Sequence, residues 1–474
     1  MKRLAAVLAI LAFILPAALS GAAEKLDPRT AVFGPPAFTP TPPIEKTLTG
    51  GAKLFLAEDH DVGLVRVYVN FLGGALSDPE GREGLADIAG QAWRAGGTAD
   101  KTPEAFDEAL EARGIHLGLS IGRESGGATL SALPGDLDTG LALLSDLLFS
   151  PAFDAERFTL AVKDREDELK REEDDPDTVA YRELRSALYK NHPRGRRVTA
   201  KSLAAVTRQD AMELSRALVD ESAWVVGAVG DFDAAEMAKK LEARFGRLKF
   251  NRAPRFARPA PPVKPEPTLV VVKKPLAQTT LLWASFGPAI QSRKRAPMEV
   301  ADFVFGGGGF QSRLSRKIRI ERGLAYAVGS FYSPNEDFGV VGMQAATATT
   351  STGEVWKLMS GELAEAGATP FTSSEVEEAR RTEQNRYIFR FEDPASLVTE
   401  RMSLELKGLP GDLVERYYRE LSAVTPEAVL DAAATSYMRD AGVWVLVGDV
   451  SADDPVFAGP WKKITLGAEG TGSR

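Results

Sequence analysis

The sequence of 474 residues contains no cysteine and only three histidines, His60, His116 and His192. Without cysteine, the chain cannot form disulfides, thiolate nucleophiles, iron–sulfur clusters or cysteine-type zinc sites. No two histidines lie within a few residues of each other, which excludes a local metal motif built on two imidazoles. These absences leave little metal or nucleophile chemistry that the chain can perform alone.

Strong positive charge and long apolar runs are missing as well. Lys and Arg number 58 against 66 Asp and Glu, a net charge of −8, whereas a nucleic-acid-binding protein shows a basic domain. Beyond the first residues, no apolar stretch approaches the length that spans a bilayer, so we expect no integral membrane association. The composition, with 44% hydrophobic and 26% charged residues, is typical of a globular protein.

The N-terminus has the pattern of a cleavable signal peptide. Lys2 and Arg3 precede an apolar run over residues 4–15, Pro16 follows, and small residues lead to Ala23. Such a run suits the apolar core of an export signal and is too short to span a membrane. We predict cleavage after Ala23 and a periplasmic protein, or a secreted one if the host has a single membrane. The alternatives are a buried N-terminal helix and an uncleaved anchor.

Proline-rich stretches divide the rest of the chain into two parts of similar size. Six prolines fall among residues 254–267, a density that neither a helix interior nor a sheet tolerates. We predict five segments: a signal peptide over residues 1–23, an extended Pro-rich lead over 24–47, an N-terminal domain over 48–252, a Pro-rich linker over 253–267 and a C-terminal domain over 268–474.

The two parts carry similar strand patterns. Residues 53–58 and 64–71 open the first part, and residues 268–273 and 280–286 open the second. Val65, Val67, Val69 and Phe71 alternate with Arg66, Tyr68 and Asn70, which predicts a strand with one buried face. Near the end of each part, an apolar strand runs into Gly-Asp, at Gly230-Asp231 and Gly448-Asp449. This spacing predicts a duplicated α+β domain; chance similarity of buried strands is the alternative.

Helices are predicted between these strands. Thr102, Pro103 and Glu104 form a capped start, with Gly114 as the stop. A long charged helix is predicted over residues 154–175, ended by Pro176. Its charged segment from Arg165 onward mixes both signs, and by composition we interpret it as a solvent-exposed face.

One helical stretch resembles a metallopeptidase motif with its key residues replaced. Residues 84–93, Gly-Leu-Ala-Asp-Ile-Ala-Gly-Gln-Ala-Trp, with Gly97-Thr98 after them, resemble the signature helix of the pitrilysin/insulinase-type zinc peptidases. That family carries an inverted His-x-x-Glu-His motif, in which two imidazoles bind zinc and the Glu acts on water. The resemblance assigns Asp87, Gly90 and Gln91 to those three places.

The resemblance also assigns the distal zinc ligand, a Glu on a later helix, to Glu168, with Glu166 as a close competitor. Asp87 and Glu168 do not make a catalytic zinc site, because such a site needs three good ligands and a base. We therefore expect this chain to bind no zinc and the helix to be structural. Residues 189–196 resemble the family stretch after the third ligand, and we interpret His192 there as a loop residue; His60 and His116 are expected on the surface or in strands.

A second motif lies in the C-terminal part. Residues 306–326 resemble the family's C-terminal signature, in which an Arg and a Tyr seven residues apart contact substrate in the zinc cleft of the first domain. Arg319 and Tyr326 match that pair, and a guanidinium and a phenol suit a peptide carbonyl or a developing oxyanion. The alternative is a helix–strand junction with a surface Arg and a core Tyr. The four glycines 306–309 lack a following Gly-Lys-Ser/Thr, so we interpret them as a flexible turn or hinge rather than a phosphate loop.

The resemblance extends over residues 53–450 and implies a fold and a function. The implied fold is α+β: two homologous α/β-roll domains, each an antiparallel-rich sheet packed with helices, in a clamshell arrangement around an extended peptide. Four such domains make one enzyme in this family, and this chain has two. The chain thus resembles a two-domain member of the mitochondrial-processing-peptidase type that lacks the zinc motif.

The leading hypothesis is the non-zinc subunit of a periplasmic heterodimeric metallopeptidase. A homologous partner subunit with the intact motif would hold the zinc, and Arg319 and Tyr326 would bind a peptide or unfolded polypeptide in the partner's site. Activity is expected only with that partner, so whether the chain counts as an enzyme stays open. One alternative is a non-catalytic peptide-binding or assembly protein of the same fold. Another is a self-sufficient metallopeptidase with an unusual ligand set, which would carry its own zinc.

Overall fold

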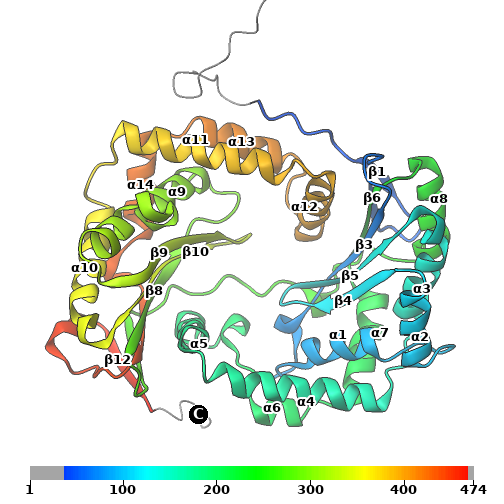
Figure 1. Cartoon of the computed structure of the whole chain (residues 1–474), viewed down its shortest axis with the longest axis horizontal. Coiled ribbons are helices and arrows are strands. Elements are labelled where there is room, and N and C mark those ends of the chain that lie inside the picture. The colour runs from blue at the N-terminus through cyan, green and yellow to red at the C-terminus, as the bar shows by residue number, and fades with distance from the viewer. Residues whose placement is uncertain (1–36, 468–474) are drawn as a thin grey trace, which may run out of the picture. The chain divides into compact units, whose positions relative to one another are not determined.

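The computed structural model describes residues 37–467 (Figure 1). The predicted signal peptide and the predicted lead up to residue 36 lie outside the described residues. From Phe38 onward, the chain is one unit with two six-stranded sheets. No helix within the described range is both long and apolar enough to cross a bilayer.

The first sheet has the strand order β1-β2-β6-β3-β5-β4. Only the pair β2 and β6 is parallel; every other neighbouring pair is antiparallel. Its strands are β1 (Ile44–Thr47), β2 (Lys53–Glu58), β3 (Val65–Leu72), β4 (His116–Ile121), β5 (Ser125–Ala132) and β6 (Trp224–Gly230). The helices of this half are α1 (Leu85–Ala95), α2 (Pro103–Glu111), α3 (Leu137–Phe149), α4 (Ala155–Glu172), α5 (Pro176–Tyr189), α6 (Ala200–Ala204), α7 (Arg208–Glu221) and α8 (Ala234–Phe245).

The second sheet has the order β12-β7-β11-β8-β10-β9. Here β7 is parallel to both β11 and β12, and the remaining pairs are antiparallel. Its strands are β7 (Thr268–Lys273), β8 (Gln278–Gly287), β9 (Ala325–Pro334), β10 (Gly339–Ala348), β11 (Val443–Gly448) and β12 (Lys462–Leu466). The helices are α9 (Arg295–Asp302), α10 (Thr352–Ala366), α11 (Ser373–Arg390), α12 (Pro394–Lys407), α13 (Leu413–Ser422) and α14 (Pro426–Ser436).

The two sheets repeat one arrangement, which confirms the predicted α+β fold class. In each half, the last long strand, β6 or β11, inserts between the first two strands of that half's opening pattern. Both inserted strands are buried along their whole length, because helices cover both faces of each sheet at this point. The alternation predicted for β3 is also confirmed, with residues 65, 67, 69 and 71 fully buried.

Each sheet buries its second face with a helix from the other half of the chain. Helix α12 packs on β6 and β2, where Val398 and Met402 meet Val225 and Phe55. Helix α5 packs on β11 and β8 in the same way (Figure 1). A Cβ at Gly227 of β6 would lie 2.4 Å from Sδ of Met402, so only glycine permits α12 to approach this closely. This exchange of helices, with α12 on the first sheet and α5 on the second, joins the two halves by burying apolar side chains.

Both exchanged helices start with the same dipeptide. The side chain of Asp175 accepts hydrogen bonds from the backbone N–H groups of residues 177 and 178, and Pro176 is the first residue of α5. Asp393 and Pro394 begin α12 likewise. An Asp N-cap followed by Pro at the first helical position fixes a sharp helix start. The predicted helix over residues 154–175 is therefore corrected: α4 ends at Glu172, and Pro176 starts a new helix.

The glycine run of the C-terminal motif is only partly a turn, which corrects the interpretation for Gly306 and Gly307; Gly308 and Gly309 do form a turn, with Gly309 at a φ of 66°. Residues Phe303–Gly307 continue α9 as a π-helical turn, and Ser315–Ile320 form a second one. A Cβ at Gly306 would lie 2.4 Å from the backbone nitrogen of Ser330, so this glycine lets the helix pack directly on β9.

Candidate functional site: a closed metal position and an exposed Arg–Tyr pair

Helix α1, which carries the degenerate motif, is anchored by a buried carboxylate. Asp78 is 4% exposed and accepts hydrogen bonds of 3.0 Å from the N–H groups of both Gly84 and Ala86. These are orphan donors of the first helical turn, so Asp78 caps α1. Burial raises the pKa of Asp78 to about 7, although these two hydrogen bonds act in the opposite direction.

The three motif positions of α1 do not form a metal site. Nε2 of Gln91 donates to Oδ1 of Asp87 at 3.3 Å, so the amide is engaged with the carboxylate one turn away. Gly90 is buried against β4, where a Cβ would lie 3.0 Å from the backbone nitrogen of Ile121. This contact explains a glycine in mid-helix, which otherwise costs about 1 kcal/mol relative to alanine.

A guanidinium sits where a metal would have to bind. Nε of Arg165, on α4, lies 3.1 Å from Oδ2 of Asp87. Nη1 of the same side chain lies 3.5 Å from Glu168 and 3.0 Å from Glu172. Arg165 is only 12% exposed, so the prediction of a solvent-exposed face is wrong for this residue. Its fixed positive charge neutralises carboxylates of α1 and α4 and ties the two helices together.

These residues do not fit zinc. An Asp, an amide and one distal Glu lack the imidazoles and the base that a catalytic zinc site needs, and Arg165 would repel a divalent cation. Within residues 37–467, no three His, Cys, Asp or Glu side chains gather closely enough to hold a metal ion. The absence of zinc from this chain stays a prediction, which the Arg165 ion pairs support. Glu166, the competing distal acid, forms no ion pair with Arg165 in the described residues.

The Arg–Tyr pair of the C-terminal half is exposed and assembled. Cζ of Arg319 lies 5.2 Å from the ring centroid of Tyr326 and 4.6 Å from that of Phe310. Tyr326 is 84% exposed and Phe310 is 62% exposed, so Tyr326 is not a core residue. Within the described residues, the Arg319 side chain has no hydrogen bond or ion pair, which leaves its donors available. Phe310 lies in the same motif, but the sequence did not identify it as a contact of Arg319, because this contact depends on the fold.

The histidines lie elsewhere, in structural roles. Nδ1 of His192 accepts from the N–H of Arg194 at 3.1 Å and caps a short turn, in line with the predicted loop position. His60 bonds Asp231 at 2.7 Å, which raises the pKa of its imidazole. His116 lies exposed on the edge strand β4.

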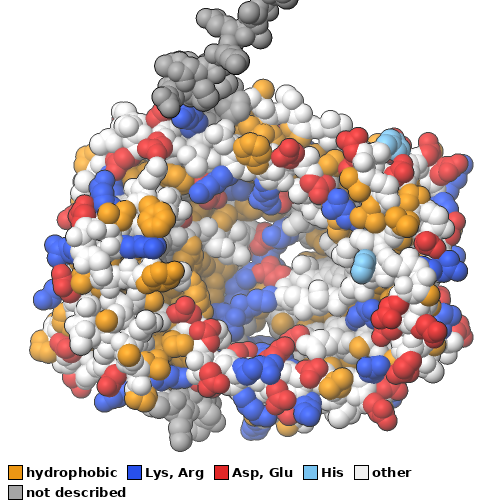
Figure 2. All heavy atoms as spheres, in the orientation of Figure 1, with side chains coloured by type: hydrophobic (Ala, Val, Ile, Leu, Met, Phe, Trp, Pro, Cys, Tyr) orange, Lys and Arg blue, Asp and Glu red, His pale blue; other side chains and the backbone are white. Residues whose placement is uncertain are grey.

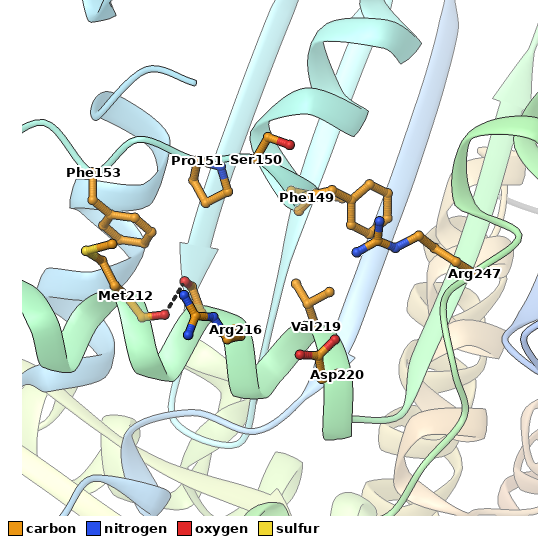
Figure 3. Close-up of a pocket in the computed structure, with 11 residues that line it drawn as sticks. Phe149, Ser150, Pro151, Phe153, Met212, Arg216, Val219, Asp220 and Arg247 are labelled. Atoms are coloured by element: carbon orange, nitrogen blue, oxygen red, sulfur yellow. Dashed lines mark hydrogen bonds between the residues drawn. The ribbon is translucent and has the colours of Figure 1, made fainter. Parts of the chain in front are cut away.

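A separate cavity of about 330 Å³ opens between α3 and α7 (Figure 3). Two serines line it, Ser150 and Ser215, and Ser215 donates to the carbonyl of Met212 at 2.9 Å. Arg247 stacks on Phe149 with its Cζ 4.0 Å from the ring centroid. No histidine lines this cavity, so Ser215 has no imidazole base beside it, and the recess shows no catalytic arrangement.

Comparisons with known proteins agree with this fold. A family model described as insulinase (peptidase family M16) matches residues 54–201, and one described as the peptidase M16 inactive domain matches residues 205–383. A crystal structure of a peptidase M16 inactive domain from Pseudomonas fluorescens superposes with a TM-score of 0.79 at 22% identity, covering 87% of this chain and 99% of that one.

Curated relatives include proteins with and without peptidase names. An "uncharacterized zinc protease" of Rickettsia bellii is 27% identical over 278 residues, which cover 58% of this chain and 66% of that protein, just under two thirds of its length. The "non-peptidase homolog YmxG" of Helicobacter pylori is 25% identical over 381 residues, covering 79% of this chain and 86% of that protein. The two family models together match most of residues 54–383, and the chain belongs to the insulinase, or M16, family of peptidases.

Proposed function

We propose that this chain is the non-catalytic subunit of a heterodimeric M16 zinc peptidase of the periplasm. A homologous partner subunit with an intact inverted motif holds the zinc, which supplies Lewis-acid activation of water. This chain contributes Arg319 and Tyr326 to the binding of a peptide or unfolded polypeptide in the partner's site. The periplasmic location rests on the signal-peptide pattern of residues 1–23.

The observation that carries the proposal is the contrast between the two candidate sites of the chain. Arg165 occupies the position of the lost metal and is itself bound to carboxylates. Arg319 and Tyr326, in contrast, contact each other and are open to solvent, with the donors of Arg319 unused in the described residues. A guanidinium that a neighbouring ring orients can bind a peptide carbonyl, and a phenol can donate to a developing oxyanion.

The test is reconstitution with a homologous M16 chain that carries the intact motif, to be sought in the same genome. Peptide cleavage should require both chains. Arg319→Ala and Tyr326→Phe should each reduce kcat/KM by roughly 100-fold, the usual cost of removing one donor to a developing oxyanion. Arg316→Ala is the matched control, because Arg316 lies on the same π-helical turn, is 55% exposed and should leave activity unchanged. Full activity of both variants, or of the partner alone, would overturn the proposal.

A second function, a non-catalytic peptide-binding or assembly protein, is favoured by the name of the Helicobacter pylori relative, a non-peptidase homolog. It predicts that this chain binds peptide but adds nothing to cleavage by any partner. The reconstitution experiment separates the two functions.

A further inference from the structure

An arginine-lined pocket adjoins the closed metal position. Its volume is about 370 Å³, and it lies between the C-terminal end of α4, helix α5 and the segment before α6. Arg165 belongs both to this pocket and to the ion pairs with α1. The lining residues are Arg165, Glu172, Asp177, Thr178, Tyr181, Arg182, Arg185, Arg197 and Val198. Four arginines thus face two carboxylates in a place where the resemblance puts the former catalytic cleft.

Three of these four arginines already have carboxylate partners. Arg165 binds residues of α1 and α4, as described above. Arg182, whose side chain is 9% exposed, pairs with Glu173 and lies 3.4 Å from Glu183. Arg197 pairs with Glu183 as well and also donates to Ser186. These ion pairs engage the guanidiniums of all three arginines with carboxylates of the chain itself.

Arg185 differs from its neighbours because it has no partner. Its side chain is half-buried, yet within residues 37–467 it forms no hydrogen bond and no ion pair. Burial lowers the pKa of Arg185, and the positive charges of Arg197 and Arg182 act in the same direction; Glu172 opposes them. A charge that is partly removed from water without a counter-ion is costly, and a bound anion would offset that cost.

Arg123 and Tyr189, two further hydrogen-bond donors near Arg185, also have no carboxylate partner within the described residues. Arg123, in the turn between β4 and β5, has one hydrogen-bond acceptor among the described residues, the backbone carbonyl of Arg194 at 3.0 Å. Burial and the charges of Arg185 and Arg194 lower the pKa of Arg123 to about 10. Tyr189 lies one helical turn after Arg185 on α5, and within the described part its hydroxyl has no hydrogen bond. The nearby Glu124 is taken by an ion pair with Arg194.

Arg123 reaches the turn that follows α5 through its hydrogen bond to Arg194, and that turn packs on α5, which carries Arg185 and Tyr189. Figure 2 shows Lys and Arg side chains on the wall of the hollow at the centre of the face drawn there, with α5 beside it in Figure 1. Two guanidiniums and a phenol, all donors, are the arrangement that binds a carboxylate through several charge-assisted hydrogen bonds.

We infer that Arg185, Arg123 and Tyr189 form a subsite that binds a carboxylate group of a peptide ligand. The inference rests on the proposed function only in taking the ligand to be a peptide. The carboxylate comes either from an acidic side chain or from the C-terminus, and both sources have the same chemistry at the subsite.

The test measures peptide binding by the full chain without any partner, so that it is independent of proteolysis. Three decapeptides of alternating Ser and Ala, each labelled with an uncharged boron-dipyrromethene dye that has no carboxylate, are compared: one with a central Glu and an amidated C-terminus, one with Gln there and an amide, and one with Gln and a free C-terminal carboxylate. Fluorescence anisotropy should show at least tenfold tighter binding of one of the two carboxylate peptides than of the neutral one. The peptide that binds identifies the source of the carboxylate.

Charge-matched variants then locate the subsite. Arg185→Gln and Arg123→Gln should each remove most of the tenfold preference without changing the affinity for the neutral peptide. Arg171→Gln removes the same charge from an exposed position of α4 and should keep the preference. The melting temperature of Arg185→Gln should be no lower than that of the unmodified chain, because an unpaired half-buried charge is removed. Equal binding of all three peptides, or equal effects of Arg185→Gln and Arg171→Gln, would overturn the inference.

Discussion

In each half of the molecule, the helix that follows the second strand of the core packs against a long charged helix. The two helix pairs, α1 with α4 and α9 with α11, neutralise their acidic side chains in different ways. In the first half, α1 and α4 share the guanidinium of Arg165 between Asp87, Glu168 and Glu172. In the second half, α9 and α11 meet around Glu299, Asp302 and Glu383.

In the second pair, burial favours the protonated form of the carboxyl groups. Burial raises the pKa of Glu299 to about 8, although the charge of Arg295 opposes it, and raises that of Asp302 to about 6. Burial raises the pKa of Glu383 as well, although Arg386 pairs with that carboxylate at 2.7 Å. Asp302 accepts hydrogen bonds from Oγ of Ser330 at 2.6 Å and from the hydroxyl of Tyr437 at 2.8 Å. The first helix pair thus shares one fixed cation among its carboxylates, whereas in the second pair nearby arginines leave the buried carboxyl groups with raised pKa values, and only the second depends on pH near neutrality.

The largest effect is expected from removing the cation of the first pair. Arg165→Ala leaves three carboxylates facing one another between α1 and α4. The free energy of unfolding should fall by about 2–3 kcal/mol, less than for a fully buried pair, because Arg165 is 12% exposed whereas Asp87 and Glu168 are nearly half exposed to screening solvent. Urea denaturation at pH 7 measures it. Arg171→Ala on the same helix is the control, since an exposed arginine away from such a network should change stability by less than about 0.5 kcal/mol. Equal losses in the two variants would show that Arg165 does not hold the helices together.

The second prediction concerns how the stability of the chain depends on pH. A carboxyl group whose pKa is higher in the folded chain binds its proton more tightly there than in the unfolded chain. Its contribution to stability is therefore complete at low pH and is lost as the pH rises through about 8 for Glu299. Between pH 6 and 8 this loss should be about 2 kcal/mol, and Glu299→Gln should abolish it because the amide does not ionise.

Thermal or urea unfolding across that pH range measures the slope of the free energy of unfolding against pH. Glu378→Gln, at an exposed position of α11, is the matched control and should leave the slope as it is. A pH dependence that survives in Glu299→Gln would assign the proton to another group, with Asp302 next to be tested by Asp302→Asn.

The comparison also separates what the sequence could predict from what it could not. Apolar runs and period-two alternation located strands such as β3 and β11, and Thr102 with Pro103 located the start of α2, because these signals are local. The role of Arg165 was missed. Composition described its segment as solvated, whereas its partner Asp87 lies on another helix, far away in the sequence.

The exchange of α5 and α12 was missed for a similar reason. An amphipathic pattern shows that a helix has an apolar face but not which sheet covers it. The repeated Asp-Pro starts at Asp175 and Asp393 were a usable signal that the two helices are equivalent. The unpaired state of Arg185 needs the positions of every neighbouring charge, which no local pattern contains.

The smallest expected effect concerns two glycines in mid-helix, one in each half. Gly361 of α10 has open space where a Cβ would be, so Gly361→Ala should raise the free energy of unfolding by about 1 kcal/mol through helix propensity alone. Gly90 of α1 offers the same gain, but its Cβ would press on the backbone of β4 at Ile121, 3.0 Å away. Crowding a packed position costs a similar amount or more, so Gly90→Ala should be neutral or slightly destabilising.

Chemical denaturation of the two variants side by side measures the difference, which should be at least about 1 kcal/mol in favour of Gly361→Ala. If both substitutions stabilise the chain equally, β4 yields to α1, and the glycine at the degenerate motif position has no packing role. If only Gly361→Ala stabilises it, the place where the family has its catalytic Glu has become a helix–strand contact. In that case a side chain at residue 90 conflicts with the packing that now holds α1 in place.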